Sequence, residues 1–256
     1  MSTNNSGLDQ RLATFIDLDL ISEICEPIKS GKEATVYRCR GTATSGHEQL
    51  ALKVYRPRER RSFKNDACYR EGSLINRIGG GNTRAARALR GGTRFGRTVQ
   101  EATWTAREWE VLQRLYDAGL AVPQPVHATD RAILMELCGD GDNGVAQPLA
   151  TARLTPEIAR ALFQAVCTDV ERMLWLDVLH ADLSPYNILW NGQEHRIIDF
   201  PQAVDPRFNG NAPSFLQRDL ENVGRFCARF AQIPDPCTVA CEMWSRFQRG
   251  ERGESP

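Results

Sequence analysis

Short apolar runs with strand character dominate the first part of the chain. Two of them, over 28–40 and 48–56, contain Val, Tyr and Leu and are separated by the Gly- and Thr-rich segment 41–46. This spacing predicts a β-hairpin, and the apolar run 132–138 predicts a further buried strand. Over 8–25, apolar residues mix with acids at roughly helical spacing, which predicts one or two short helices ahead of the main fold.

Helical spacing dominates the later part of the chain. The segment 103–118 places two tryptophans and two leucines on one face, and Gly119 follows where a helix would end in a left-handed residue. Thr155 and Pro156 have the character of an N-cap and a first-turn proline, so they predict the start of a second helix. The apolar spacing recurs over 219–230 and 236–249, which predicts two more helices.

A glycine-containing break at 139–144 separates the strands from the later helices, and we expect a hinge there. Strands first and helices later indicate an α+β fold with two lobes rather than an alternating one. The expected organisation is an N-terminal extension over 1–17, a strand-rich N-lobe over 18–138, a helical C-lobe over 139–250 and a disordered tail over 251–256.

The segment 58–98 differs in composition from the rest of the predicted N-lobe. From Arg56 to Arg97 there are twelve Lys or Arg residues and three Asp or Glu residues, whereas the whole chain has 32 of each kind. Glycines are frequent and large apolar residues are few, so the segment cannot bury enough surface to offset its ordering entropy. We expect a mobile basic loop that could contact RNA or a ribosomal partner.

The bulk composition is that of an ordinary globular protein, with 41% hydrophobic and 25% charged residues. No apolar run approaches the roughly 20 residues that a membrane helix needs. The first residues lack the basic start and apolar stretch of a secretory signal. The eight cysteines are scattered, as in proteins of reducing compartments. We therefore expect a cytoplasmic protein without a membrane partner.

The strongest chemical signal is the motif His180-Ala-Asp182-Leu-Ser-Pro-Tyr-Asn187, followed by Ile-Ile-Asp199-Phe. Phosphoryl transfer requires an oriented acceptor and Mg²⁺ held against the triphosphate. The H-x-D-x-x-x-x-N spacing is the catalytic-loop signature of kinases, and a following Asp is the main metal ligand. Asp182 is then the base or orienting residue, while Asn187 and Asp199 bind Mg²⁺. The alternative is a polar turn between two buried strands.

The first part of the chain offers the complement. Lys53 lies in an aliphatic stretch, where an unpaired Lys is costly to bury. A kinase places its phosphate-binding Lys there and pairs it with a Glu of the first large helix, for which Glu108 is the candidate. The turn Ser30-Gly31-Lys32 could present backbone amides and a cation to phosphates. A solvated helix face is the alternative for Glu108.

Six segments resemble the RIO family of atypical kinases in order and spacing, and the resemblance runs from about residue 18 to residue 230. They are 30–37, 52–55, 115–125, 180–187, 202–206 and 218–222. The resemblance implies a small protein-kinase-like fold without the usual activation segment. It also implies an ATP-dependent serine/threonine kinase or ATPase that uses Mg²⁺, with Mn²⁺ as an alternative, and phosphorylates a protein acceptor or itself.

An adenine pocket follows by analogy with kinases, although each of its apolar residues taken alone is more often a core residue. The backbone of Glu136 and Leu137 would pair with the edge of the base. The pocket walls would be Val36, Ala51, Met135, Leu137, Leu189 and Ile198.

Two other functions fit parts of the pattern. A small-molecule kinase of the aminoglycoside or choline kinase type shares the H-x-D-x-x-x-x-N motif, but it needs an acceptor pocket that this chain has little length to build. A nucleotide-gated binding module would hydrolyse ATP slowly and hold RNA through the basic loop.

Overall fold

The computed structural model describes residues 10–56, 94–139 and 144–251 of the chain. These residues form two compact units. The first comprises 10–56, 94–110 and 124–137, and the second comprises 111–123, 138–139 and 144–251. Residues 111–123, which the sequence analysis placed in the N-lobe, thus belong to the second unit. Residues 57–93 of the expected basic loop and 252–256 of the expected tail lie outside the described residues.

The first unit is built on an antiparallel sheet with the strand order β1-β2-β3-β5-β4. The predicted hairpin is present as β2 (Ala34–Gly41) and β3 (Gln49–Tyr55), and the predicted buried strand is β5 (Ala132–Glu136). The two edge strands are β1 (Ile21–Ser30) and β4 (Pro125–Ala128). Because β5 lies beside β3, residues 132–136 pair with residues 50–54.

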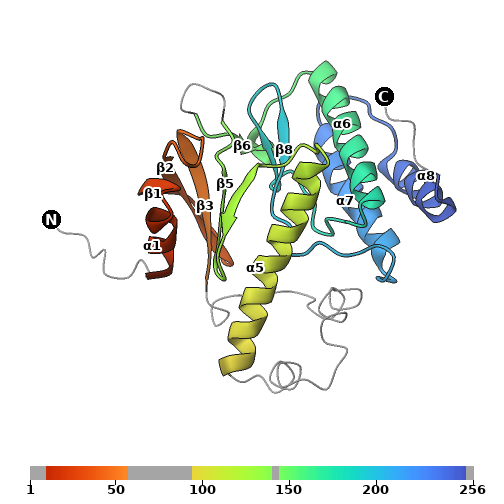
Figure 1. Ribbon diagram of the computed structural model, residues 1–256. Coiled ribbons are helices and arrows are strands. Elements are labelled where there is room, and N and C mark those ends of the chain that lie inside the picture. Colours follow the sequence, from red (N-terminus) through yellow and green to blue (C-terminus); the bar gives the residue numbers. More distant parts are fainter. Residues whose placement is uncertain (1–9, 57–93, 140–143, 252–256) are drawn as a thin grey trace. The chain divides into compact units, whose positions relative to one another are not determined.

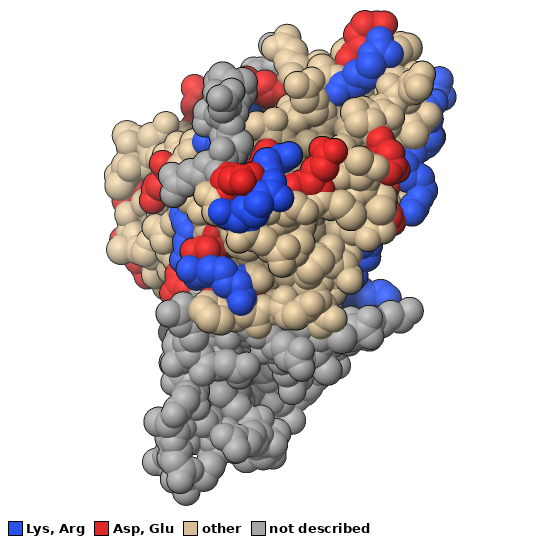
Figure 2. All heavy atoms as spheres, turned by 90° about the vertical axis from the view of Figure 1, so that its right-hand side faces the viewer, with Lys and Arg blue, Asp and Glu red and all other residues tan. Residues whose placement is uncertain are grey.

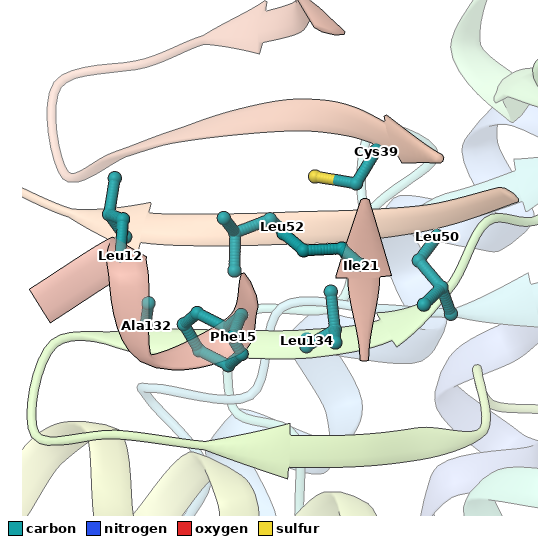
Figure 3. Packing of buried hydrophobic residues seen from close by; sticks show 8 residues of the cluster. All are labelled: Leu12, Phe15, Ile21, Cys39, Leu50, Leu52, Ala132 and Leu134. Atoms are coloured by element: carbon teal, nitrogen blue, oxygen red, sulfur yellow. The ribbon is translucent and has the colours of Figure 1, made fainter. Parts of the chain in front are cut away.

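The two faces of this sheet have different tasks. Leu50, Leu52 and Leu134 point to one face, where they pack with Leu12 and Phe15 of helix α1 (Gln10–Asp17) (Figure 3). The whole buried cluster comprises Leu12, Phe15, Ile21, Cys39, Leu50, Leu52, Ala132 and Leu134. Side chains alternate along a strand, so Ala51 and Lys53 point to the opposite face.

Two expectations for the start of the chain are therefore corrected. The segment 8–25 is not purely helical, because α1 ends at Asp17 and strand β1 begins at Ile21. Nor is α1 an extension outside the fold, since Leu12 and Phe15 are buried in the sheet's core. The pairing of β1 with β2 has several register shifts, one of them at Pro27, and this irregularity removes the simple alternation that reveals a strand.

Helix α5 (Arg94–Asp117) is longer than the predicted helix over 103–118 (Figure 1). Residues 94–98, assigned by composition to the basic loop, are its first turn and a half. Extending an existing helix adds one hydrogen bond per residue fixed, so good helix formers such as Arg can join it despite Gly96. Gly119 ends the helix with φ +71°, as predicted, and the amide of Leu120 donates to the carbonyl of Leu115 over 3.1 Å.

The second unit is mainly helical. It contains α6 (Pro156–Trp175), α7 (Ala212–Cys227) and α8 (Pro236–Arg249), a 3-10 turn η2 (Leu149–Thr151), and a small sheet of β6 (Gln147–Pro148), β7 (Ile188–Trp190) and β8 (His195–Ile197). The predicted cap is present, since Thr155 Oγ1 accepts from the amide of Ile158 over 3.3 Å. Helix α7 begins earlier than residue 219, because Pro213 suits a first turn and Phe215 and Leu216 continue the apolar face.

Two arginines cap the ends of α5 and α6 reciprocally within the second unit. Arg172 of α6 donates to the carbonyls of Ala118 and Gly119, just past the end of α5, over 2.6 and 3.3 Å. Arg114 of α5 donates to the carbonyl of Leu176, just past the end of α6, over 3.1 Å. Carbonyl groups at the end of a helix have no partner within that helix, and the helix dipole is negative there. Each arginine therefore supplies both a hydrogen-bond donor and an opposite charge.

Charges of both signs lie side by side on the face of the molecule shown in Figure 2. Ion pairs of the helices include Arg246 with Glu171 at 2.7 Å and Arg160 with Glu157 at 3.2 Å. None of the described helices is long and apolar enough to cross a membrane.

Candidate active site

The predicted catalytic loop, 180–187, lies between α6 and β7 in the second unit. It contains Ala181 at φ +63°, and Asp199 after β8 has φ +74°. Residues other than Gly rarely adopt this left-handed conformation, and it persists where the surroundings hold it. Ala181 directly precedes Asp182, and Asp199 is itself the second predicted catalytic carboxylate. The backbone there is specifically held.

His180 ties this loop to the segment that carries Asp199. Its ring is buried and packs against Phe200, with ring centroids 5.0 Å apart. The amide of Asp182 donates to Nδ1 of His180 over 3.3 Å, so Nε2 carries the proton and donates to the carbonyl of Ile198 over 3.0 Å. His180 thus holds the start of the loop against the segment that carries Asp199.

Asn187 is the second tie. Its side-chain Nδ2 donates to the backbone carbonyl of Asp182 over 2.9 Å. Its backbone carbonyl accepts from the amide of Ile198 over 3.0 Å. The side-chain amide group is therefore oriented, which leaves Oδ1 as the atom that could bind a cation. The structure brings Asp182, Asn187 and Asp199 together, as the motif predicts.

The carboxyl of Asp182 has a raised pKa. Partial burial is the main cause and the nearby Asp199 carboxylate adds to it, while Arg218 acts in the opposite direction. Two carboxylates close together disfavour ionisation of both unless a cation lies between them. A raised pKa also brings Asp182 closer to the pH at which a general base works well.

Three residues of α7 support the loop and were not assigned a role from the sequence. Asp219 is buried, and its two oxygens accept from the amides of Ala181 and Leu183 over 2.8 and 3.0 Å. Burial raises the pKa of Asp219 to about 8, although Arg218 and both amides act to lower it.

Neighbours on α7 complete this support. Arg218 donates to the carbonyl of Ala181, and Asn222 Nδ2 donates to the carbonyl of Leu183 over 3.1 Å. A signal was available in the sequence, since Asp219 lies on the apolar face formed by Leu216, Leu220 and Val223. A carboxylate on a buried helix face must have partners.

The predicted contact between Lys53 and Glu108 is present in the first unit. Lys53 Nζ lies 2.7 Å from Glu108 Oε1, and their side chains are only 11% and 3% exposed. The β3 strand holds Lys53 and α5 holds Glu108. Such a pair fixes the ammonium group at one place on the sheet.

Lys53 shares its face of the sheet with three predicted adenine-pocket residues. Val36 pairs with Lys53 across β2 and β3, and Ala51 pairs with Met135 across β3 and β5. Directly opposed residues of antiparallel strands point to the same face. The amide of Glu136 donates to the carbonyl of Gln124 over 2.8 Å, so it is not available to the edge of a base. Leu137, the other predicted backbone contact of the base edge, directly follows Glu136.

Leu189 and Ile198 belong to the second unit. Leu189 pairs with Arg196 across β7 and β8, and Ile198 is fixed by its contacts with Asn187 and His180. Both side chains are partly buried.

The turn at Ser30, Gly31 and Lys32 joins β1 to β2, and all three residues are exposed. The amide of Gly31 donates to the carbonyl of Ala34 over 2.9 Å. Arg56 braces the turn, because its Nη2 donates to Ser30 Oγ over 2.6 Å and to Thr35 Oγ1 over 3.1 Å. The hydroxyl of Ser30 is thus engaged by an arginine.

The oxygen ligands of the second unit fit Mg²⁺ rather than a transition metal. Asn187 and Asp199 offer one amide oxygen and one carboxylate, and Mg²⁺ is commonly bound by one or two carboxylates together with substrate phosphates. Within the described ranges, no cluster of three or more His, Cys, Asp or Glu residues could hold a metal by itself. Asn187 and Asp199 would leave the other coordination positions of Mg²⁺ to substrate phosphates and water.

Known proteins resemble this chain over most of its length. A family model described as RIO domain matches residues 35–237. Serine/threonine-protein kinase RIO1 of Chaetomium thermophilum is 30% identical, over 89% of this chain and 45% of that kinase. The RIO-type serine/threonine-protein kinase Rio1 of Haloferax volcanii is also 30% identical, over 89% of this chain and 69% of that protein. The chain thus spans less than half the length of the first relative.

Solved structures agree on the fold. The Rio2 kinase of Chaetomium thermophilum, in a complex with ADP/Mg²⁺ and phosphoaspartate, has a TM-score of 0.63 and 20% identity, over 94% of this chain and 72% of that one. A second structure of this Rio2 kinase also has a TM-score of 0.63, with 18% identity. The predicted α+β, protein-kinase-like fold is confirmed.

Proposed function

The chain belongs to the RIO family, and we propose that it is an ATP-dependent serine/threonine protein kinase that uses Mg²⁺. The observation that carries the proposal is the set of hydrogen bonds joining the catalytic loop to the Asp199 segment. His180 and Asn187 each bind Ile198, and Asn187 also binds the carbonyl of Asp182. A polar turn would not need this cross-linking, whereas phosphoryl transfer depends on positioning.

The proposal gives each of the predicted site residues a role. Asp182 orients the acceptor hydroxyl and accepts its proton. Asn187 Oδ1 and the Asp199 carboxylate would hold Mg²⁺, which supplies charge neutralisation for the phosphates when bound. Lys53, fixed by Glu108, contributes a cation to the phosphates, and the exposed Lys32 of the turn contributes a second one.

Incubation with γ-labelled ATP and Mg²⁺ tests the proposal, with free phosphate, label on the chain and label on an added protein measured separately. Asp199→Asn should abolish all Mg²⁺-dependent chemistry, because the metal loses its carboxylate. Asp182→Asn should slow transfer by about 10²- to 10⁴-fold while nucleotide binding stays nearly normal. Glu194→Gln is the control, since its exposed carboxylate pairs with Arg196 in the β7–β8 hairpin. Wild-type activity in both Asp variants would refute the site.

A second activity is suggested by the phosphoaspartate in the related Rio2 kinase structure. In this second reaction the Asp199 carboxylate attacks the γ-phosphorus of ATP, the bond from that phosphorus to the β-phosphate oxygen breaks, and ADP leaves. Water then cleaves the acyl phosphate, so the net reaction is ATP hydrolysis. Hydroxylamine cleaves acyl phosphates but not phosphoserine. Hydroxylamine-labile label that Asp199→Asn lacks would support an ATPase, and stable label on Ser or Thr would support a conventional kinase.

Other partners stay predictions. Mn²⁺ could replace Mg²⁺ at the same oxygen ligands. The expected contact of the basic loop with RNA or a ribosomal partner involves residues 57–93, which lie outside the described ranges. A cytoplasmic location rests on the sequence alone.

A further inference from the structure

The chain segment after Asp199 is fastened to the start of the catalytic loop. Val204 and Leu179 exchange two backbone hydrogen bonds, of 2.8 and 2.9 Å. These bonds join the two segments at Val204, whereas His180 and Asn187 join them at Ile198. The short stretch between Asp199 and Val204 is therefore fixed at both of its ends.

One guanidinium group strengthens this junction. Arg207 Nε and Nη2 donate to the two carboxylate oxygens of Asp205 over 3.0 and 2.7 Å. The Nη1 of the same group lies 2.9 Å from Asp177 Oδ2. Asp177 precedes the catalytic loop and Asp205 follows the Asp199 segment. We call the set Asp177, Arg207 and Asp205 the arginine clamp.

The clamp is a network rather than an isolated surface pair. Asp205 is 11% exposed, Asp177 32% and Arg207 45%. Asp177 has φ +56°, a conformation that its surroundings must hold. Exposed ion pairs contribute little singly, but bidentate Arg–carboxylate geometry and a shared third charge make an exception.

In protein kinases controlled by phosphorylation, a new phosphate–Arg contact orders the segment beyond the metal-binding Asp. The Arg of the H-R-D signature is absent from this motif, because Ala181 occupies that position. The arginine clamp instead supplies both signs of charge from unmodified side chains. It joins the same two parts of the domain that carry Asp182 and Asp199.

We infer that Arg207 is a positioning residue, and that the arginine clamp holds Asp199 opposite Asp182 without any covalent modification. The inference rests on the proposed function for its effect on turnover, but the clamp itself has a physical consequence that needs no activity. The amides of residues 198–204 should be protected from hydrogen exchange for as long as the clamp is intact.

Hydrogen–deuterium exchange of the full chain tests the clamp directly. Arg207→Met should speed exchange across 198–204 at least severalfold, and Arg207→Lys should fall between Arg207→Met and wild type, since an ammonium group cannot bridge both carboxylates in the same way. Arg246→Met is the matched control, because it removes an Arg–Glu pair of 2.7 Å between α8 and α6. Unchanged exchange over 198–204 in Arg207→Met would overturn the inference, whatever the activity.

Turnover then tests the functional role. Arg207→Met should lower kcat roughly tenfold and raise the Mg²⁺ concentration for half-maximal rate, because a displaced Asp199 binds the metal less well. Its melting temperature should change no more than that of Arg246→Met. A fall in melting temperature with an unchanged Mg²⁺ requirement would show that Arg207 is merely structural. Absence of turnover in the wild type would refute the proposed function, and the exchange result would still decide the clamp.

Discussion

At the scale of single residues, the burial of Lys53 and Glu108 decides how they can be tested. Two opposite charges removed from water pay a large desolvation cost, which their mutual attraction offsets only when both are present. Removing one partner takes away this attraction while the other charge stays buried. A loss of activity in such a variant therefore has to be separated from a loss of folding.

Lys53→Met should destabilise the protein by about 3–5 kcal/mol, because Glu108 then remains buried without its ammonium partner. The double variant Lys53→Met, Glu108→Leu should regain most of this free energy of unfolding, since both charges of the pair are then removed. Denaturant unfolding measures both, and ATP turnover should be lost in both. If the double variant is no more stable than Lys53→Met, the 2.7 Å contact does not carry the energetic coupling described here.

How far a site can be predicted depends on whether its residues act through a local pattern. Asp182 and Asn187 lie within one motif and Asp199 follows it closely, so a short stretch of sequence predicts that all three lie together. Asp219 acts on that motif from a distant helix, and only its occurrence on an apolar face hints at a buried role. The engagement of the Glu136 amide by Gln124 depends on how β4 and β5 are joined, which no local pattern shows.

At the scale of elements, α1 and β1 belong to the core of the first unit. Phe15 is fully buried, and its ring lies 5.8 Å from that of His127 in edge contact. Ile16, the next residue of the same helix, is 47% exposed. Adjacent residues of one helix thus allow a matched comparison.

Phe15→Ala should cost about 3–5 kcal/mol, because a large side chain leaves a cavity in the cluster around Leu52 and Leu134. Ile16→Ala should change the free energy of unfolding by about 0.5 kcal/mol or less, since the side chain remains half in water. Chemical denaturation of the two variants checks the difference. Equal small effects would return α1 to the status of an extension.

The elements that were predicted poorly share a cause. β1 is an edge strand with a proline and shifted register, and its exposed face leaves few apolar positions to reveal it. The first turns of α5 and α7 contain Gly96 and Pro213, residues that suggest a break when read locally. By contrast, the hairpin of β2 and β3 and the capped helix α6 carry their signals within a few residues.

At the scale of the whole molecule, each unit contains a buried thiol that can report on its integrity. Burial raises the pKa of Cys39 in the first unit to about 12 and that of Cys227 in the second to about 11. A thiolate is the reactive form, and an unperturbed Cys has a pKa of about 8.5. Unfolding therefore lowers the pKa of both thiols and raises their thiolate fraction at pH 8.

Pulsed alkylation with iodoacetamide at pH 8 should label the exposed Cys241 under native conditions and spare Cys39 and Cys227. The two buried thiols should become reactive only across the denaturant transition of their own unit, so peptide mass spectrometry would follow each unit separately. Native labelling of Cys39 or Cys227 as fast as Cys241 would contradict their burial.

The reciprocal arginine caps of α5 and α6 tie the molecule to its ionic environment. Arg114 and Arg172 are exposed, so dissolved ions screen their attraction to the negative ends of the helix dipoles. A buried contact such as that of Lys53 with Glu108 is screened much less. Added salt would thus loosen the junction of α5 and α6 while leaving the contact of Lys53 with Glu108 in place. The stability that Arg114 and Arg172 contribute at these helix ends should therefore fall as the ionic strength rises.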